Sequence, residues 1–395
     1  MPNQTYDPAS HSSPRNAIVI GGGIAGCATA HALAQRGVEV TLIDRAAQLA
    51  SGASGNPRGI LHARFGAGDN PLHQFVLAAY QHALRWLDEV LPVDGVARAQ
   101  CGLLQLACNA VEVKRLGRLA QQTWPAHLMQ FVDAAQASEL AGIEMHFGGA
   151  WFPTGGWVVP PVLCAKLASD ARIKQRLDHN VESLLKTQTG WRVQGQTEQG
   201  ATWQEEAEVL VVCCAHTAKK FEQFSHLKLT PVRGQISVVA QTPDSQTLRA
   251  VVCGDGYCAP VLNGEHVMGA THAFDDESAT TRAADHAENL ARLNAYAPTL
   301  RQALGERAAE DWQGRASVRC SAPGSMPLVG RVDEGLYCSL GHGTRGLLTA
   351  GISAEVIAAQ LCRESPPLPP AILDALSPLR RVGHSAPPRI IATLN

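Results

Sequence analysis

The stretch AIVIGGGIAG at residues 17–26 constrains the fold more than any other part of the chain. Its first four residues are apolar, which predicts a strand buried on both faces. Gly21, Gly23 and Gly26 then fall in the spacing G-x-G-x-x-G. Residues 24–36 are rich in alanine and contain no proline, which predicts a helix. The order strand, glycine turn, helix predicts the first unit of a parallel α/β sheet.

The glycines and the acid of this unit suit a dinucleotide. Gly21 allows a sharp turn, Gly23 has no Cβ to block a pyrophosphate, and Gly26 lets the helix lie close to the sheet. The free N–H groups and the dipole of the helix favour a phosphate anion. A second strand over residues 38–43 ends at Asp44, whose carboxylate is placed to bind a ribose hydroxyl, so FAD or NAD is favoured over NADP. The predicted contacts are Gly21, Gly22, Gly23, Ile24, Ala25, Gly26, Asp44 and Arg45.

Two more glycine-rich segments are candidates for ligand contacts. The first is SGASGNPRG at residues 51–59, where Ser51 and Ser54 could donate to phosphate oxygens, unless this is an ordinary surface loop. The second is GHGTRG at residues 341–346, which runs into a helix predicted over residues 347–362 and suggests a second anion contact. Its candidate residues are Gly343, Thr344, Arg345 and Gly346.

Composition limits the classes of protein to which the chain can belong. A hydrophobic content of 45% permits a large core, and a net charge of −2 argues against indiscriminate nucleic-acid binding without excluding a local basic patch. The eleven cysteines are scattered without a C-x-x-C pair, which favours reduced core cysteines in a cytoplasmic protein without a metal site. No apolar run approaches the roughly twenty residues that a membrane span needs. We therefore expect a cytoplasmic location without membrane contact.

The pattern of elements predicts an α/β fold, a Rossmann-like FAD-binding domain with an inserted antiparallel-sheet substrate domain. Short strands joined by glycine turns dominate residues 229–315 and suggest a sheet with one face free for substrate. The FAD-binding domain is expected in three parts and the substrate domain in two, between a disordered leader and a tail. In chain order these segments are 1–15 (leader), 16–95 (FAD), 96–150 (substrate), 151–228 (FAD), 229–315 (substrate), 316–381 (FAD) and 382–395 (tail).

Taken together, these residues resemble the D-amino-acid oxidase-like superfamily of FAD-dependent amine oxidoreductases. Within it the chain is similar to the flavin half of the bifunctional bacterial enzymes that make 5-methylaminomethyl-2-thiouridine in tRNA. It departs from the family at Gly324, where Asp is common, and at Cys214-Ala215, where Asn-Gly is common. The methyltransferase half precedes the flavin half in those enzymes, so methyl transfer by this chain is not expected. The motifs that carry the resemblance are residues 51–56, 155–160, 254–260, 318–320 and 327–330.

The resemblance implies a specific oxidation. Its substrate would be the carboxymethylaminomethyl group on the wobble uridine of tRNA, and its products aminomethyl-uridine and glyoxylate. Arg319 is the expected carboxylate clamp, because a guanidinium binds a carboxylate through two parallel N–H bonds. Arg345 is the second candidate, and Tyr257 could close the pocket, although a surface arginine or a plain sheet tyrosine is the simpler explanation for each. Covalent attachment of FAD through Cys320 is a minor alternative, and we expect FAD to be bound non-covalently.

Three functions remain open from the sequence. The chain could oxidise tRNA, it could oxidise a free amine of the glycine or sarcosine type, or it could be a flavin-binding partner of a separate methyltransferase without turnover. A broad basic mouth around the pocket would favour tRNA. Arg380, Arg381 and Arg389 are candidates for that mouth, although such a cluster is usually only solvated. His62, Arg64 and His216 also follow predicted ligand loops or strands, and their roles stay open.

Overall fold

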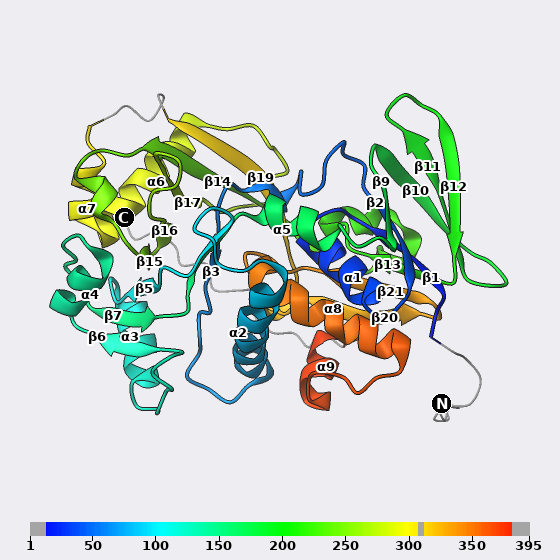
Figure 1. The fold of residues 1–395 in the computed structure, drawn as a ribbon, viewed down its shortest axis with the longest axis horizontal. Coiled ribbons are helices and arrows are strands. Elements are labelled where there is room, and N and C mark those ends of the chain that lie inside the picture. Colours follow the sequence, from blue (N-terminus) through cyan, green and yellow to red (C-terminus); the bar gives the residue numbers. More distant parts are fainter. Residues whose placement is uncertain (1–12, 307–311, 381–395) are drawn as a thin grey trace.

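The computed structural model describes residues 13–306 and 312–380. The predicted tail lies wholly outside these residues, together with Arg381 and Arg389, and so do residues 1–12 of the predicted leader. Figure 1 shows two lobes. One is built on the strands predicted to bind a dinucleotide, and the other on the antiparallel strands.

The first lobe is a six-stranded sheet in the order β20-β21-β13-β1-β2-β9. The central strand β1 pairs in parallel with β2 on one side and with β13 on the other. Ala17 and Val19 of this strand face one apolar core, and Ile18 and Ile20 face another, as a strand buried on both faces requires. The strands are β1 (Asn16–Ile20), β2 (Glu39–Ile43), β9 (Ile173–Arg176), β13 (Val209–Val212), β20 (Leu328–Asp333) and β21 (Leu336–Leu340).

Different elements cover the two faces of this sheet (Figure 1). On one face α1 (Ile24–Ala34) packs against α8 (Gly346–Cys362) and α5 (Pro160–Leu167). Both α1 and α8 are buried almost all round, because helices lie on both sides of them. On the other face lies a three-stranded meander, β10 (His179–Lys186), β11 (Trp191–Thr197) and β12 (Thr202–Ala207).

The second lobe is a nine-stranded, mostly antiparallel sheet. Its strand path is β18-β14-β17-β16-β15-β5-β7-β6, and β19 pairs with β14 outside this path. β5 lies parallel to β15, so residues 96–150 and 229–315 contribute to one sheet. The strands are β5 (Leu103–Leu106), β6 (Gln130–Val132), β7 (Gly149–Phe152), β14 (Thr230–Ala240), β15 (Val251–Gly254), β16 (Gly256–Cys258), β17 (Glu265–Gly269), β18 (Ala273–Phe274) and β19 (Gln313–Ser321).

Helices flank this second sheet and join the lobes. The long helix α2 (Pro71–Val90) begins with the Asn70 side chain accepting a hydrogen bond from the His73 N–H at 3.0 Å, and it packs on α8. A small sheet of β3 (Gly59–Leu61), β4 (Arg98–Ala99) and β8 (Gly156–Val158) lies between the lobes. The remaining helices are α3 (Ala110–Leu119), α4 (Ala134–Ala141), α6 (Ala283–Tyr296), α7 (Pro298–Ala303) and α9 (Pro370–Leu376).

Strand β19 links the two lobes along the chain. It pairs with β14 over its whole length, from Gln313 to Ser321, and so runs through the predicted boundary between residues 315 and 316. The turn after it leads into β20 and β21 of the first sheet. Residues on one strand can therefore contact both a bound dinucleotide and a substrate.

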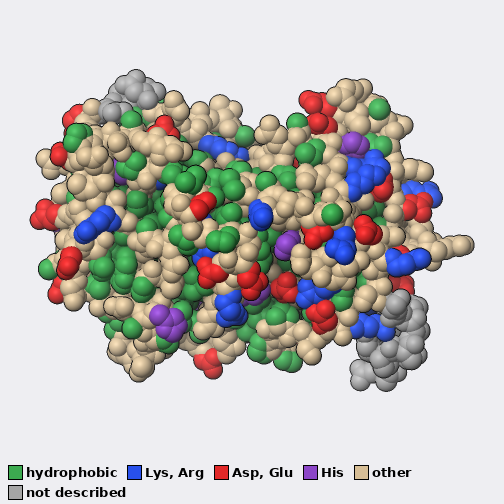
Figure 2. Space-filling view, in the orientation of Figure 1, with side chains coloured by type: hydrophobic (Ala, Val, Ile, Leu, Met, Phe, Trp, Pro, Cys, Tyr) green, Lys and Arg blue, Asp and Glu red, His purple; other side chains and the backbone are tan. Residues whose placement is uncertain are grey.

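Charges are mixed over the surface. In Figure 2, Lys and Arg side chains are interspersed with Asp and Glu over the visible face. Any recognition of a polyanion must therefore use a local group of cations rather than the field of the whole molecule. Among the described residues, none of the helices has the length and apolar character needed to cross a membrane.

Candidate active site

A cavity of about 980 Å³ runs from the start of α1 to the antiparallel sheet. It brings most of the predicted site residues together, although they come from four separate parts of the chain. Gly22 and Gly26 do not line it. The predicted residues that do are Gly21, Gly23, Ile24, Ala25, Asp44, Arg45, Ser51, Ser54, Tyr257, Arg319, Gly343, Thr344, Arg345 and Gly346.

The three fingerprint glycines have different roles. Gly21 has φ +116°, and a Cβ there would lie 2.7 Å from the Cys213 carbonyl oxygen. A Cβ on Gly26 would lie 1.7 Å from the Gly21 carbonyl oxygen, so α1 can approach the turn only with glycine there. A Cβ on Gly23 would meet only the Ser54 hydroxyl, at 3.2 Å. Gly21 and Gly26 therefore serve the protein's own packing, and Gly23 keeps space open at the cavity.

Asp44 is held in place by the backbone around it. Its Oδ2 accepts a hydrogen bond from the Gly22 N–H at 2.5 Å, and its Oδ1 accepts one from the Ala46 N–H at 2.8 Å. A carboxylate has about four acceptor positions, so lone pairs remain for the hydroxyls of a ribose. Asp44 also lines the cavity, as that role requires.

The loop of residues 51–56 is fixed by an arginine that the sequence analysis missed. Arg315 on β19 donates to the carbonyl oxygens of Ser51 at 2.7 Å and Gly52 at 2.6 Å, and to Asn56 Oδ1 at 3.3 Å. Ser54 Oγ accepts from the Ile24 N–H at 3.0 Å and keeps its own hydrogen. The Ser51 hydroxyl donates to the Gln48 carbonyl oxygen at 2.7 Å, so binding of phosphate by Ser51 stays a prediction that needs this hydroxyl to turn.

A second helix terminus faces the same cavity. α8 begins at Gly346 without a side-chain cap, and residues 343–346 line the cavity. The Gly343 N–H donates to the Cys320 carbonyl oxygen at 2.7 Å, which ties this turn to β19. A Cβ on Gly346 would lie 3.2 Å from the Ile24 side chain, so α1 and α8 begin close together. Their positive ends favour an anionic ligand between them.

These observations fit a dinucleotide with a pyrophosphate and a ribose. Gly23 leaves space, the first turns of α1 and α8 offer N–H groups, and Asp44 offers acceptors. Cys320 also lines the cavity, and burial raises the pKa of its thiol to about 12. A thiol with such a pKa is a poor nucleophile at neutral pH.

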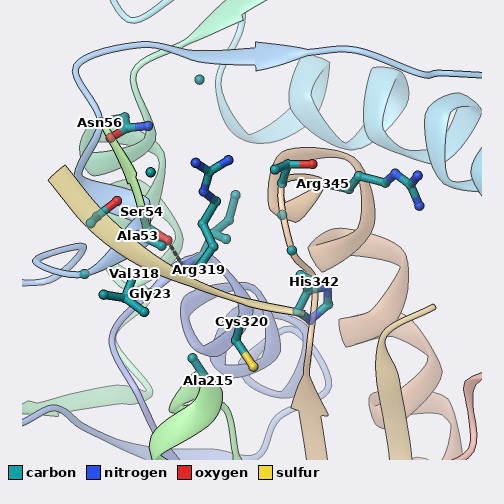
Figure 3. Close-up of a pocket in the computed structure, with 18 of the residues that line it drawn as sticks. Gly23, Ala53, Ser54, Asn56, Ala215, Val318, Arg319, Cys320, His342 and Arg345 are labelled. Atoms are coloured by element: carbon teal, nitrogen blue, oxygen red, sulfur yellow. Dashed lines mark hydrogen bonds between the residues drawn. The ribbon is translucent and has the colours of Figure 1, made fainter. Parts of the chain in front are cut away.

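Arg319 lies where the cavity meets the antiparallel sheet. Its Nη2 donates to the Thr271 carbonyl oxygen at 2.8 Å, and its Nη1 lies 3.1 Å from His272 Nε2. Burial lowers the pKa of Arg319, yet no carboxylate of the described residues lies within ion-pair distance of it. Figure 3 shows its side chain rising from β19 into the space between the loop that carries Ser54 and Asn56 and the turn that carries Arg345. A partly buried guanidinium that lines a cavity and has no carboxylate partner is suited to binding an anionic group of a ligand.

His272 and Gly234 help to position the side chain of Arg319, and neither residue was predicted from the sequence. The pKa of His272 is lowered to about 4 by burial and by the charges of Arg319 and Arg292, so its imidazole is neutral near pH 7. Because arginine only donates, His272 Nε2 must accept, and the ring proton lies on Nδ1. A Cβ on Gly234 would lie 1.4 Å from Arg319 Nη2, so glycine at this position makes room for the guanidinium.

Tyr257 and Arg345 lie on different sides of the cavity. Tyr257 is on β16, and burial raises its pKa while the charges of Arg319 and Arg58 act in the opposite direction. Arg345 donates to the Ser325 carbonyl oxygen at 3.1 Å, and burial and the charge of Arg64 lower its pKa. Its side chain points away from Arg319 in Figure 3. The two arginines therefore do not form one clamp in this conformation.

The remaining candidates from the sequence are His62, His216 and Arg380. His62 Nε2 is buried without a hydrogen-bond partner, and burial together with Arg115 and Arg64 lowers the pKa of this histidine to about 3. His216 lies 3.4 Å from Glu277 at another part of the wall. Arg380 donates to the carbonyl oxygens of Pro323, Met326, Pro327 and Ala375, so its donors are already used within the fold. Within the described chain, no group of three His, Cys, Asp or Glu residues is arranged to hold a metal.

Comparisons with known proteins agree with this geometry. The family model "DAO: FAD dependent oxidoreductase" matches residues 16–360. A protein of Nitrosospira multiformis named "tRNA 5-methylaminomethyl-2-thiouridine biosynthesis bifunctional protein MnmC" is 51% identical over 96% of this chain, and one of the same name from Chromobacterium violaceum is 40% identical over 93%. The chain covers 62% and 59% of their lengths, so it spans less than two thirds of these relatives.

Solved structures show the same architecture at low sequence identity. Glycine oxidase from Geobacillus kaustophilus superposes with a TM-score of 0.75 at 23% identity, covering 94% of this chain and all of that one. L-proline dehydrogenase from P. horikoshii gives 0.73 at 19% identity, covering 94% of this chain and 98% of that one. The α/β fold with an antiparallel-sheet lobe is thereby confirmed. With the family model matched over most of its length, the chain belongs to the DAO family of FAD-dependent oxidoreductases.

Proposed function

We propose that the chain oxidises the carboxymethylaminomethyl group of the wobble (2-thio)uridine in tRNA and releases glyoxylate, leaving aminomethyl-uridine. One structural observation carries the proposal. Arg319 is a partly buried cation without a carboxylate partner among the described residues, and it shares a cavity with the dinucleotide fingerprint. The names of the MnmC relatives supply the tRNA part of the proposal.

FAD would be held without a covalent bond by the residues that fit it. Gly23 and the first turns of α1 and α8 would face its pyrophosphate and anionic ring, and Asp44 its ribose. When bound, FAD supplies a two-electron acceptor for the carbon next to the amine nitrogen. The net reaction removes two electrons from the CH–NH group and consumes one water as the C–N bond to the carboxymethyl group is broken.

The residues of the chain would position the substrate. Arg319 would bind the carboxylate through two N–H bonds, while Thr271 and His272 hold the guanidinium in place. This sets which carbon faces the acceptor, and such orientation contributes strongly to rate. Tyr257 would form the wall beside the carboxylate, and Arg345 would be available to a more distant part of the substrate.

Nucleoside analysis of tRNA tests the proposal. A strain lacking this chain should accumulate carboxymethylaminomethyl-(2-thio)uridine, and the purified enzyme should convert that nucleoside in the isolated tRNA. Unchanged tRNA in such a strain would contradict the proposal. A separate methyltransferase is the proposed partner for the later methyl transfer, and a tRNA substrate would place the enzyme in the cytoplasm.

A free amine oxidase is the second candidate, and the position of Arg319 fits it equally well. Arg319 would bind the carboxylate of glycine or sarcosine just as well, because all these substrates end in a glycine-like carboxylate. Rapid flavin reduction by glycine or sarcosine, without any effect on tRNA, would select this candidate. A flavin-binding subunit without turnover would be indicated if every amine left the flavin oxidised.

A further inference from the structure

The cavity continues past Arg319 to helix α3, which no part of the proposed chemistry uses. Asn109, Val111 and Glu112 line the same cavity as Arg319. Asn109 caps α3 by accepting a hydrogen bond from the Glu112 N–H at 3.0 Å, so the N-terminal end of this ten-residue helix is fixed at the cavity wall.

The single acid of α3 is buried and neutralised. Arg115 binds Glu112 at 2.6 Å, and Arg64 from the loop after β3 binds its other oxygen. Burial alone would raise the pKa of Glu112, but the hydrogen bonds and charges of both arginines bring its pKa below the usual value. Glu112 therefore stays ionised and holds Arg64 at the cavity wall, with the Arg64 side chain 46% exposed.

The solvent-exposed face of α3 is basic and partly apolar. Val111, Lys114 and Arg118 follow at i, i+3 and i+7, which places them on one stripe of the helix. Within the described residues, neither Lys114 nor Arg118 has a carboxylate within ion-pair distance. Val111 is 50% exposed. Asp255 also lines the cavity, and Arg292 lies 3.8 Å from it.

We propose that this α3 surface, made of Arg64, Val111, Lys114 and Arg118, binds the RNA strand that carries the substrate nucleoside. The inference rests on the proposed tRNA function and adds where the RNA lies. Lys114 and Arg118 would neutralise phosphates, Val111 would contact a sugar or base, and Arg64 would lie where the strand leaves the cavity. Charge complementarity supports an RNA occupant, because the exposed charges of this surface are all positive.

A double charge reversal with a matched control tests the α3 surface. The test variant is K114E/R118E, and the control is K174E/K228E, which changes the net charge equally on the Rossmann-like lobe. Binding of an anticodon stem-loop RNA is measured by fluorescence anisotropy over a series of salt concentrations. Flavin reduction by the free nucleoside 5-carboxymethylaminomethyl-uridine, which has no phosphate, is measured in parallel. K114Q/R118Q repeats the test without introducing acids, in case the reversal disturbs folding.

We expect K114E/R118E to weaken RNA binding at least tenfold, and the control to weaken it less than threefold. In K114Q/R118Q the slope of log affinity against log salt should fall by about 1.4, since each lost single-strand phosphate contact contributes about 0.7. Reduction by the free nucleoside should stay within twofold. Equal losses in test and control would overturn the α3 assignment while leaving the tRNA function intact. A wild-type enzyme that neither binds nor converts tRNA would overturn both.

Discussion

Arg319 is the residue on which the proposed chemistry depends most. Arg319→Lys keeps the charge but loses the planar fork, so it should slow flavin reduction much more than it weakens FAD binding. A charged hydrogen bond contributes about 1.5–3 kcal/mol, which corresponds to roughly a tenfold to hundredfold loss of rate. Arg319→Ala should be slower still and lose the preference for carboxymethylated amines. Stopped-flow reduction measures this directly, and wild-type rates in both variants would make Arg345 the first candidate.

His272 should act only through Arg319. His272→Leu removes the acceptor for Arg319 Nη1, while His272→Gln keeps a side-chain oxygen near the same place. We expect the leucine variant to raise the KM for a carboxylate-bearing substrate about tenfold, and the glutamine variant to recover most of it. FAD affinity should not change, because His272 has no contact with the fingerprint loop. Equal KM values in the two variants would show that the hydrogen bond does not position Arg319.

At the residue scale, short motifs were predictable and contacts across strands were not. Gly21 and Asp44 stand in a local motif whose spacing predicts a dinucleotide site, and Arg319 stands in one of the motifs that carry the family resemblance. Gly234 lies on β14 and His272 directly precedes β18, so only the pairing of β14 with β19 and with β18 brings these two residues near Arg319. A single sequence without that pairing gives no reason to select either residue.

At the element scale, β19 couples the cofactor loop to the substrate end of the cavity. Arg315 and Arg319 lie four residues apart on this strand and so point to the same face. Arg315→Ala should weaken FAD binding about tenfold, because loop 51–56 loses hydrogen bonds to three of its residues. Arg331→Ala on β20 is the matched control, since the Arg331 side chain contacts only its own turn, at Asp333. Fluorescence titration of the apoprotein with FAD measures both, and equal affinities would contradict the role of Arg315.

Elements with a strong local pattern were predicted well. The helices predicted over residues 24–36 and 347–362 form as α1 and α8, and their bounds agree with the prediction to within two residues at each end. β19 was not predicted as a long strand, because Arg315, Ser317 and Arg319 on its cavity face do not look like a sheet core. Its pairing with β14 forms it, and tertiary contacts of this kind override local propensity.

At the scale of the whole molecule, the parallel sheet was predictable and the second sheet only in part. The βαβ unit places β1 and β2 side by side, and the buried strand β13 pairs with β1 on its other side. The predicted antiparallel strands of residues 229–315 do form a sheet, but its full extent depends on β5, β6 and β7. The parallel contact between β5 and β15 joins segments almost 150 residues apart, and periodicity within each segment does not encode it.

Acid should destabilise the whole fold through histidines that line the cavity. Desolvation lowers the pKa of His62 to about 3 and that of His342 to about 4, from the usual 6.5. Between pH 6.5 and 4 the unfolded chain therefore binds more protons, so stability is complete above pH 6.5 and falls as the pH decreases. Each such histidine contributes at most about 1.4 kcal/mol per pH unit in this window. Urea unfolding at pH 5, 6 and 7 should show this slope, and His342→Asn should flatten it. A slope of opposite sign would show that these histidines are charged in the fold.

FAD should stabilise the folded protein without being chemically attached to it. The residues that fit FAD lie on α1, β2, α8 and loop 51–56, so a ligand that binds all of them holds separate parts of the chain together. Binding to the folded state alone adds about 2.7 kcal/mol at a free ligand concentration of a hundred times Kd. Purified protein should be yellow, acid precipitation should release the colour into solution, and the melting temperature of the apoprotein should rise with added FAD. Colour that remains in the pellet would contradict non-covalent binding. A melting temperature that rises with NAD but not with FAD would show that the fingerprint binds a different dinucleotide.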